Sequence, residues 1–486
     1  MIKFKNVGFR YKNSLDEAEF ALENIDLDIK SGECVLFCGV SGCGKTSICR
    51  IINGLIPNYY EGDLSGEVII RGEESKSLNM VERAYFSGSV FQNPKTQFFN
   101  NNVVSEIAFT SENMGVSPAT IRMQVERQID DFQLNNVRNS LLHQMSGGEK
   151  QRVACAAASA MEQDLLILDE PSSNLDYKSI ERLRVILEMW KKQGKTIIIS
   201  EHRLYFLKEI VDTVYVLDKG KIVKKFTQAE FSLLSDSELK SMGLRSLLPV
   251  KSNSTIIKSM KPSSISIDNL VVKYNKKTAL TIPYFSMNWT GVCAIVGDNG
   301  AGKSTFINAL SGLVKSKHGK IIINGRGYLS KELQKNCYIV SQDVTHQLFS
   351  DSVYEEIACS KNITDDEINI LLKELNLYHK KDVHPMSLSG GERQRLSIGV
   401  ALAIDKKIIF FDEPTSGLDC QNMQKTSRLI NELSRQGKTI FVITHDIEFI
   451  INACNHVLQI ESGQIVSESS LSDRYDEQLS KIFNRR

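Results

Sequence analysis

Gly39-Val40-Ser41-Gly42-Cys43-Gly44-Lys45-Thr46 is a glycine-rich stretch, and it has a counterpart in Gly297-Asp298-Asn299-Gly300-Ala301-Gly302-Lys303-Ser304. Both copies fit the pattern Gly-x4-Gly-Lys-Ser/Thr. In this pattern backbone N–H groups surround phosphates, the lysine reaches the outer phosphates and the hydroxyl faces Mg²⁺. The sequence therefore predicts two phosphate-binding loops in one chain.

Each loop lies between an apolar segment and a segment that favours a helix. The apolar segments Cys34–Cys38 and Val292–Val296 are expected to be strands, and Ser47–Ile52 and Phe306–Leu310 are expected to be helical. A strand before the loop and a helix after it are the context that a phosphate-binding loop requires. Upstream, alternating side chains predict further strands at residues 2–11, 21–30 and 264–274.

Three further landmarks occur in both halves of the chain at one spacing. Ser146-Gly147-Gly148-Glu149-Lys150-Gln151-Arg152 is matched 243 residues later by Ser389-Gly390-Gly391-Glu392-Arg393-Gln394-Arg395. The apolar run that ends in Asp169-Glu170-Pro171 has its counterpart in Asp412-Glu413-Pro414, and His202 in His445, at the same offset. Such a repeat indicates a duplicated domain.

Length and composition are those of a globular protein with more than one domain. The chain has 486 residues, 42% of them hydrophobic, and a formal net charge of +1. A single core rarely serves so long a chain, and the balanced charge gives no reason to expect a nucleic acid partner. We expect a first domain at residues 1–248, a linker at 249–263 and a second domain at 264–486. Residues 228–248 should be a short helical extension, and 470–486 a surface helix.

The sequence lacks the features of a membrane-spanning or secreted chain. No run approaches the ~18 to 20 apolar residues of a membrane helix, and the N-terminus lacks the apolar core of a signal peptide. A cytosolic location is therefore expected. The ten cysteines include no Cys-x2-Cys pair, so we expect free thiols that pack as small apolar residues.

Each of the two apolar runs ends in a pair of carboxylates. Asp169 and Asp412 are expected to hold Mg²⁺, directly or through water, beside the phosphate-binding loops. Glu170 and Glu413 follow one residue later and are expected to polarise the attacking water. The chemistry that this arrangement predicts is hydrolysis of a nucleoside triphosphate.

The order of the five motifs resembles that of ABC-transporter nucleotide-binding domains, and the resemblance covers nearly the whole chain twice. It implies an α/β fold with two tandem P-loop NTPase domains. Each domain would have a mainly parallel core sheet with helices, an antiparallel β subdomain and a helical subdomain. The implied cofactors are ATP and Mg²⁺.

In this family two domains face each other head to tail, and the signature of one completes the ATP site of the other. Site one would join the loop of Lys45 to Ser389-Gly390-Gly391, and site two would join the loop of Lys303 to Ser146-Gly147-Gly148. The chain would then be an intramolecular pseudo-dimer. A serine and glycine N–H groups at a helix N-terminus suit an anionic γ-phosphate.

The resemblance assigns roles residue by residue. The expected catalytic residues are Glu170, His202, Glu413 and His445. The expected magnesium ligands are Thr46, Gln92, Asp169, Ser304, Gln342 and Asp412. The expected ATP contacts are Tyr11, Gly39, Ser41, Gly42, Cys43, Gly44, Lys45, Thr46, Ser47, Gln92, Ser146, Gly147, Gly148, Tyr274, Gly297, Asn299, Gly300, Ala301, Gly302, Lys303, Ser304, Thr305, Gln342, Ser389, Gly390 and Gly391.

Several of these assignments rest on position within the motifs. His202 and His445 each lie 32 residues after their glutamate and resemble the family's switch histidine. Glu201 departs from the commoner threonine at its position and could tune site one. Tyr11 and Tyr274 look like the family's adenine-stacking aromatic. Ser173–Asp176 and Ser416–Asp419 resemble the loop that links the two sites.

The segment Val90–Phe99, which contains Gln92-Asn93-Pro94, is similar to a segment of energy-coupling factor (ECF) importer ATPases, as is Asn53–Gly62. The second half has Ser341–Phe349, which keeps Gln342 but lacks Asn-Pro. In that family the segment lines a groove for a membrane partner. The resemblance implies a transmembrane scaffold subunit, a separate substrate-binding membrane subunit and a peripheral position on the cytoplasmic face of the membrane. The implied cargo is a vitamin, a vitamin precursor or a transition-metal ion.

Three alternatives remain at this point. A tandem ATPase of a sugar importer commonly has a degraded second loop, whereas Lys303 and Glu413 are intact here. A soluble ABC translation factor would need a long charged helical linker. A DNA-repair or chromosome-organising ATPase would need a long coiled-coil insertion.

Overall fold

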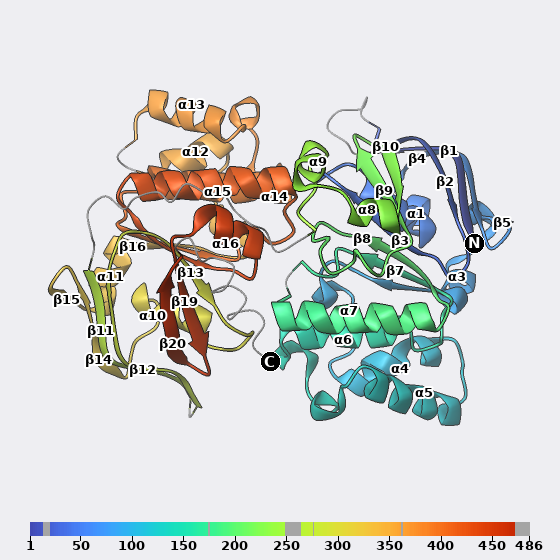
Figure 1. Cartoon of the computed structure of the whole chain (residues 1–486), viewed down its shortest axis with the longest axis horizontal. Helices are drawn as coiled ribbons and strands as arrows, with labels where there is room; N and C mark the ends of the chain where they lie inside the picture. Colours follow the sequence, from blue (N-terminus) through green and yellow to red (C-terminus); the bar gives the residue numbers. More distant parts are fainter. Residues whose placement is uncertain (13–19, 174, 248–263, 276, 361–362, 472–486) are drawn as a thin grey trace. The chain divides into compact units, whose positions relative to one another are not determined.

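A computed structural model describes residues 1–12, 20–173, 175–247, 264–275, 277–360 and 363–471 (Figure 1). The chain divides into two compact units, one made chiefly of residues 1–248 and the other chiefly of residues 249–486. The predicted linker, residues 249–263, lies outside the described residues. So does the predicted C-terminal helix, apart from Ser470, which ends a strand, and Leu471.

The first unit has a six-stranded sheet in the order β10-β9-β3-β8-β7-β6. Its strands are β3 (Cys34–Gly39), β6 (Ser87–Val90), β7 (Leu165–Asp169), β8 (Thr196–Ser200), β9 (Thr213–Asp218) and β10 (Lys221–Thr227). All pair in parallel except β10, which runs antiparallel to β9. Every residue of β3 and β8 is buried, as is typical of parallel strands covered on both faces.

A second, antiparallel sheet of the first unit has the order β2-β1-β4-β5. It comprises β1 (Ile2–Tyr11), β2 (Leu22–Ile29), β4 (Gly62–Ile70) and β5 (Glu73–Glu74). Ile2 and Phe4 are buried whereas Lys3 and Lys5 are exposed, so the start of β1 has one core face and one solvent face. The buried face packs in one cluster with Ile48 of the helix after the phosphate-binding loop.

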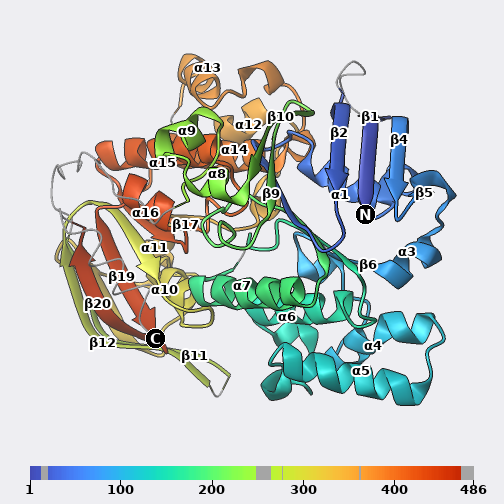
Figure 2. The same cartoon turned by 45° about the vertical axis from the view of Figure 1, so that its right-hand side comes forward.

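The helices of the first unit are α1 (Lys45–Ile52), α2 (Leu55–Asn58), α3 (Met80–Phe86), α4 (Val103–Asn113), α5 (Pro118–Asp131), α6 (Gly147–Ala158), α7 (Tyr177–Lys192), α8 (Gln228–Ser232) and α9 (Asp236–Ser241), with short 3₁₀ turns at Ser75–Ser77, Pro94–Thr96, Asn135–Val137 and Leu142–Gln144. Figures 1 and 2 show α4 and α5 lying beside α6 as a helical subdomain. Helix α1 begins two residues before the predicted start because Gly44, at φ 104°, is its N-cap. Helices α8 and α9 form the short helical extension that the sequence predicted.

The second unit repeats this plan with the sheet orders β16-β17-β18-β13-β19-β20 and β12-β11-β14-β15. Only β20 is antiparallel within the six-stranded sheet. The strands are β11 (Ser264–Tyr274), β12 (Lys277–Asn288), β13 (Gly291–Val296), β14 (His318–Ile323), β15 (Arg326–Tyr328), β16 (Cys337–Val340), β17 (Ile408–Asp412), β18 (Thr439–Ile443), β19 (His456–Glu461) and β20 (Gln464–Ser470).

The helices of the second unit are α10 (Lys303–Leu310), α11 (Ser330–Asn336), α12 (Val353–Ala358), α13 (Asp365–Glu374), α14 (Gly390–Ala403), α15 (Cys420–Arg435) and α16 (Ile447–Ala453), with 3₁₀ turns at Val344–Gln347, Tyr378–Lys380 and Pro385–Ser387. Helix α12 lies beside both α13 and α14 (Figures 1 and 2). The predicted fold is thus confirmed in both units: a mainly parallel core sheet, an antiparallel sheet and a helical subdomain. Parallel strands end at one edge of each core sheet, and the predicted site residues follow those ends.

Candidate functional site

The first phosphate-binding loop connects β3 to α1 in a conformation that requires glycine. Gly39, Gly42 and Gly44 have φ angles of 145°, 80° and 104°. A Cβ on Gly39 would lie 2.2 Å from the carbonyl oxygen of Leu217, so no side chain fits there. The Lys45 ammonium is buried and donates to the carbonyl oxygens of Gly39, at 3.2 Å, and Val40, at 3.1 Å. The loop therefore wraps around the lysine.

The second loop, between β13 and α10, has the same geometry. Gly297, Gly300 and Gly302 have φ angles of 148°, 82° and 102°. The Lys303 ammonium donates to the carbonyl oxygens of Gly297, at 2.7 Å, and Asp298, at 3.0 Å. Both halves thus contain a complete phosphate-binding loop.

The remaining loop residues differ in exposure. Ser41 and Asn299 are exposed, and Thr305 is half-buried. Cys43 and Ala301 are buried at matching positions. Burial raises the pKa of the Cys43 thiol even though Lys45 lies nearby, so Cys43 packs as a neutral side chain. No disulfide joins any of the ten cysteines, all of which lie within the described residues, and only Cys359 is exposed.

The end of β7 brings a carboxylate to the first loop. Thr46 Oγ1 donates to Asp169 Oδ1 at 3.1 Å, and Ser200 Oγ donates to the same oxygen. Burial raises the pKa of the Asp169 carboxyl against these two hydrogen bonds. In the second unit Ser304 Oγ lies 3.4 Å from Asp412 Oδ2, and burial raises the pKa of Asp412 as well.

Glu170 lies between two of the other predicted residues. Its Oε1 is 3.2 Å from His202 Nε2, and its Oε2 accepts a hydrogen bond from Gln92 Nε2 at 2.7 Å. Burial acts to raise the pKa of Glu170, but the hydrogen bond with His202 and the Lys45 ammonium outweigh burial and lower it. Glu170 is therefore ionised at neutral pH, as a general base must be.

The second unit brings the corresponding pair together. Glu413 Oε1 lies 3.6 Å from His445 Nε2, and both side chains are largely buried. Glu170 and Glu413 have φ angles of 45° and 49°, a region that non-glycine residues rarely adopt. The same strained backbone at both glutamates fits a position that is held for chemistry.

The two Ser-Gly-Gly signatures are helix N-termini. Ser146 caps α6 and Ser389 caps α14, each with its side chain accepting from a backbone N–H three residues later. The glutamates Glu149 and Glu392 accept from the serine N–H groups at 2.8 Å in return. The capping box closes the N-terminus of each of these two long helices. The first turn, which is the positive end of the helix dipole, is the predicted phosphate contact.

The two predicted adenine-stacking tyrosines have different surroundings. The Tyr11 hydroxyl lies 3.0 Å from Ser47 Oγ and accepts from Arg50 at 3.0 Å, and its ring meets Phe9 edge-on at 4.7 Å. Tyr274 is exposed. Their stacking on adenine stays a prediction.

Two residues near the first loop were not predicted. Arg50 links Tyr11 to α1 and lies over the Tyr60 ring at 3.9 Å, and Ser200 fixes Asp169. The position of Ser200 directly before the Glu-His pair is the signal that could have found it. Arg50 has no such signal, because an arginine in the last turn of a helix is common.

The donors near each loop suit Mg²⁺. They are hydroxyl and carboxylate oxygens, the ligands of a hard cation, and Thr46 already contacts Asp169. Among the described residues, no group of three or more His, Cys, Asp or Glu side chains could hold a metal by itself. Mg²⁺ commonly takes only one or two protein carboxylates and completes its shell with phosphates and water.

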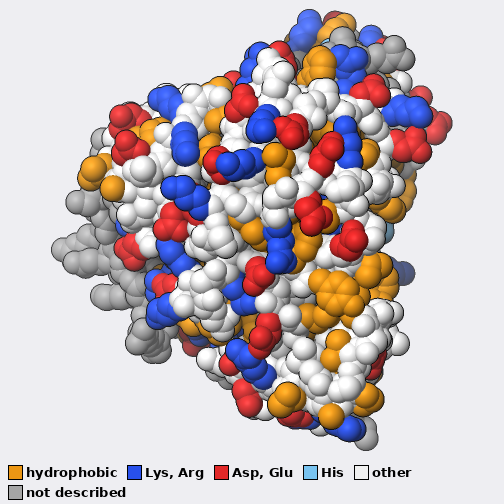
Figure 3. Space-filling model, turned by 90° about the vertical axis from the view of Figure 1, so that its right-hand side faces the viewer, with side chains coloured by type: hydrophobic (Ala, Val, Ile, Leu, Met, Phe, Trp, Pro, Cys, Tyr) orange, Lys and Arg blue, Asp and Glu red, His pale blue; other side chains and the backbone are white. Residues whose placement is uncertain are grey.

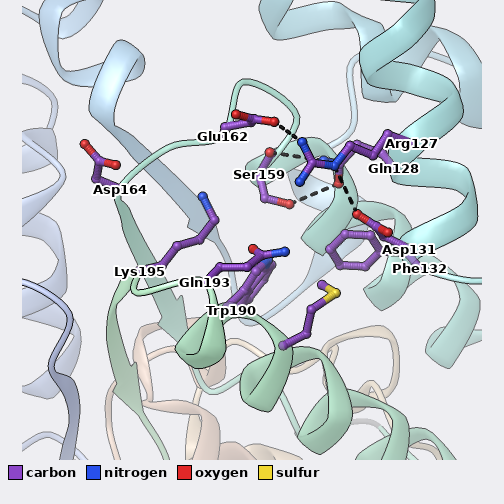
Figure 4. A pocket seen from close by; sticks show the side chains of 11 residues that line it. Arg127, Gln128, Asp131, Phe132, Ser159, Glu162, Asp164, Trp190, Gln193 and Lys195 are labelled. Atoms are coloured by element: carbon purple, nitrogen blue, oxygen red, sulfur yellow. Dashed lines mark hydrogen bonds and ion pairs between the residues drawn. The ribbon is translucent and has the colours of Figure 1, made fainter.

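A pocket of about 380 Å³ in the first unit lies apart from these residues (Figure 4). Its charged side chains pair within the protein: Arg127 contacts Asp131 and Glu162, and the Lys195 ammonium donates to the Gln163 carbonyl at 2.7 Å. None of the predicted ATP or magnesium residues lines it. We therefore do not assign it to the nucleotide.

The surface drawn in Figure 3 mixes Lys and Arg with Asp and Glu rather than gathering charge of one sign. This agrees with 59 basic and 58 acidic residues in the sequence. Within the described ranges, no helix combines the length and the apolar character needed to cross a bilayer.

A family model described as ABC transporter matches residues 22–173 and 282–416, which contain both loops and both glutamates. The chain belongs to the ABC transporter family. It is an ATPase with two tandem ABC domains, and ATP is the ligand that such domains bind.

Relatives match over nearly the full chain. A provisionally named ABC transporter ATP-binding protein of Treponema denticola is 42% identical over 96% of this chain and 97% of its own length. A Bacillus subtilis protein that carries the provisional name HMP/thiamine import ATP-binding protein YkoD is 28% identical over 99% and 94%. The archaeal ribosome recycling factor aABCE1, solved with the ribosomal stalk protein aP1, is 24% identical, with a TM-score of 0.66 over 98% of this chain and 92% of that chain. This last likeness shows the tandem ABC fold alone.

Proposed function

We propose that this ATPase powers an ECF-type importer of a vitamin, a vitamin precursor or a transition-metal ion, bound to the cytoplasmic face of a membrane. The observation that carries the proposal is an exposed phenylalanine in each unit, Phe99 and Phe349, which are 77% and 81% exposed. Each stands on a loop that is anchored from within. Large exposed aromatic side chains on an ordered loop are typical of an interaction site.

One pair of glutamine hydrogen bonds anchors each loop, in the same way in both units. Gln97 accepts from the Phe91 N–H at 3.1 Å and donates to the Ser89 carbonyl at 2.9 Å. Gln347 does the same with the Ser341 N–H and the Ile339 carbonyl, both at 2.9 Å. The loops therefore keep one shape although the second lacks Asn-Pro.

A glutamate supports each exposed phenylalanine directly. Glu106 accepts from the N–H groups of Phe99 and Asn100 at 3.1 and 2.8 Å. Glu356 accepts from those of Phe349 and Ser350 at 2.9 and 2.8 Å. Because these hydrogen bonds already fix the backbone at the phenylalanine, binding a partner there costs little conformational entropy of the loop. Each unit thus offers one preformed contact to a transmembrane scaffold subunit.

The relative named for HMP/thiamine import supports a vitamin precursor as cargo. The importer would also need a separate substrate-binding membrane subunit, since no cargo site is assigned to this chain. The intact Lys303 and Glu413 distinguish it from sugar-type tandem ATPases with a degraded second loop. The likeness to the ribosome recycling factor concerns the fold and favours neither function.

For ATP hydrolysis we propose two composite sites, each with the loop of one unit and the Ser-Gly-Gly signature of the other. Glu170, which is ionised, and Glu413, each beside its histidine, would take the proton of the attacking water. Lys45 and Lys303 would bind the outer phosphates. Bound Mg²⁺, held by Thr46 with Asp169 and by Ser304 with Asp412, would neutralise phosphate charge. ATP would close the two units, and hydrolysis would release them.

Co-purification tests the importer proposal. The tagged chain is extracted from membranes of its own cell with mild detergent, beside a variant that carries Phe99→Ala and Phe349→Ala. We expect the parent chain, and not the variant, to retain a transmembrane scaffold and a small membrane protein. Recovery of ribosomes in place of membrane subunits would contradict the proposal.

A further inference from the structure

Glu201 is a buried carboxylate directly before His202, with only 2% of its surface exposed. Its Oε1 accepts from the N–H groups of His202 at 2.7 Å and Arg203 at 3.0 Å. Its Oε2 accepts from the N–H of Ser172 at 3.1 Å. Ser172 follows Glu170 by two residues, so one side chain binds the backbone beside both members of the Glu170–His202 pair.

In the second unit a carboxylate also connects the two corresponding loops, but it follows the histidine in the sequence instead of preceding it. Asp446, directly after His445, accepts from Thr415 Oγ1 at 2.9 Å. Its own N–H donates to Thr444 Oγ1 at 3.0 Å. Thr415 follows Glu413 by two residues and therefore corresponds to Ser172.

The two units carry different charges at the positions that flank the histidine: Glu201 and Arg203 correspond to Thr444 and Asp446. Where Asp446 stands in the second unit, the first has Arg203, which is buried and donates to the carbonyl oxygens of Ser172, at 3.4 Å, and Leu175, at 3.2 Å. Within the described part of the chain, the buried Ser172 hydroxyl has no hydrogen-bond partner. The acceptor that its counterpart Thr415 uses is missing there because position 203 is an arginine.

We propose that Glu201, together with Arg203, is the positioning element that holds His202 against Glu170 in the first unit. A carboxylate can accept three N–H groups, whereas a threonine hydroxyl cannot replace it while Arg203 stands beside it. In the second unit Thr444 and Asp446 hold His445 against Glu413 in the corresponding way. This inference rests on the proposed catalytic roles of Glu170 and His202, and it does not depend on the cargo.

The test exchanges the two arrangements in a chain that carries Glu413→Gln, so that turnover reports on the first glutamate. Three variants are compared with this parent: Glu201→Thr, Arg203→Asp, and both together. The double variant recreates the second unit's arrangement, and its new aspartate can accept from the Ser172 hydroxyl. Steady-state kcat and KM for ATP and thermal unfolding are measured for each.

We expect each single variant to lower kcat about 10-fold or more with little change in KM, since only the transition state needs the aligned pair. We expect the double variant to recover kcat to within about threefold of its parent, because residues in one hydrogen-bond network are coupled. Folded single variants with unchanged kcat, or a double variant that shows the product of the two losses, would overturn the proposal.

Two further variants keep the test decisive. If Glu201→Thr does not fold, Glu201→Gln replaces it. The glutamine oxygen can still accept from the N–H groups of His202 and Arg203, but the glutamine NH₂ group faces the Ser172 N–H, so kcat should fall. An unchanged kcat would overturn the role of Glu201. Glu170→Gln in the same parent separates the role of Glu201 from that of the proposed catalytic base. Activity that survives this change removes the proposed catalytic base, whereas a failed exchange with an inactive Glu170→Gln variant removes only the role of Glu201.

Discussion

Gln92 Nε2 donates a hydrogen bond to Glu170 Oε2 at 2.7 Å, which connects the start of the loop that bears Phe99 to the proposed catalytic base. A displacement of that loop by a bound partner would therefore reach Glu170 through one side chain. The link offers a short physical path between the proposed membrane subunit and ATP hydrolysis.

Gln92→Glu should move the acid limb of the pH–rate profile to higher pH. A second carboxylate beside Glu170 disfavours its ionised form and raises its pKa, so the base is lost at a higher pH. The profile of kcat is measured in the Glu413→Gln chain. Asn93→Asp is the control, because it adds the same charge one residue away and keeps the acceptor used by the Lys95 N–H. Equal profiles for the two variants would contradict this link.

Glu170→Gln combined with Glu413→Gln should lower phosphate release by about 100-fold or more, the usual contribution of a general base. ATP binding should persist, because neither glutamate belongs to a phosphate-binding loop. Phosphate release and equilibrium nucleotide binding are measured side by side. Hydrolysis at the parent rate would refute the roles of both residues.

Phe99→Ala should weaken binding to the proposed membrane partner while the ATP affinity and the thermal midpoint stay unchanged. Phe99 is exposed and stacks on Phe109 with ring centroids 4.9 Å apart, so its removal leaves the core intact. Phe98 packs against the core, so Phe98→Ala should instead lower the free energy of unfolding by ~1–3 kcal/mol. Tyr85→Ala, an exposed aromatic on α3, is the matched control. A Phe99→Ala complex as stable as the parent complex would exclude this surface.

His456 should make the second unit less stable as the pH falls from about 6.5 towards 4. Its ring stacks on Trp289 at 4.0 Å, and burial lowers its pKa from 6.5 to about 4. Between these two pH values the imidazole is protonated in the unfolded chain but neutral in the folded chain. The contribution of His456 to the free energy of unfolding is therefore complete above about pH 6.5 and is lost as the pH falls towards 4. His456→Phe keeps a stacked ring and should reduce the fall in thermal midpoint between pH 7.5 and 5. His346→Phe, at an exposed histidine, should not.

The fold and most of the local site geometry follow from short-range patterns in the sequence. The glycines of the loop of Lys45 require positive φ angles, and the buried strand β7 ends at Asp169, so the pattern of residues places both at one sheet edge. The predicted roles of Glu170, His202 and Thr46 have the same origin, since each residue follows a parallel strand or a glycine-rich turn.

Other features depend on contacts that no short pattern contains. The sequence marked Glu201 only as a departure from threonine, because its three backbone partners lie on two separate loops. No short pattern predicts the roles of Gln97 and Gln347 either, because their side-chain amides anchor two loops that differ in sequence. The sequence predicts a partner groove along Val90–Phe99 as a whole but does not distinguish its two phenylalanines: Phe98 packs against the core, whereas Phe99 is exposed.

Each proposed ATP site takes its loop from one unit and its signature from the other, and two double variants test this proposal directly. Lys45→Ala with Ser389→Asp places both changes in one proposed site, whereas Lys45→Ala with Ser146→Asp places one change in each site. Aspartate preserves a helix cap but brings a negative charge to the γ-phosphate. The measurement is the steady-state ATPase rate of both chains beside Lys45→Ala alone. We predict that the Ser389→Asp chain matches Lys45→Ala and that the Ser146→Asp chain falls well below it; the reverse order would contradict the composite sites.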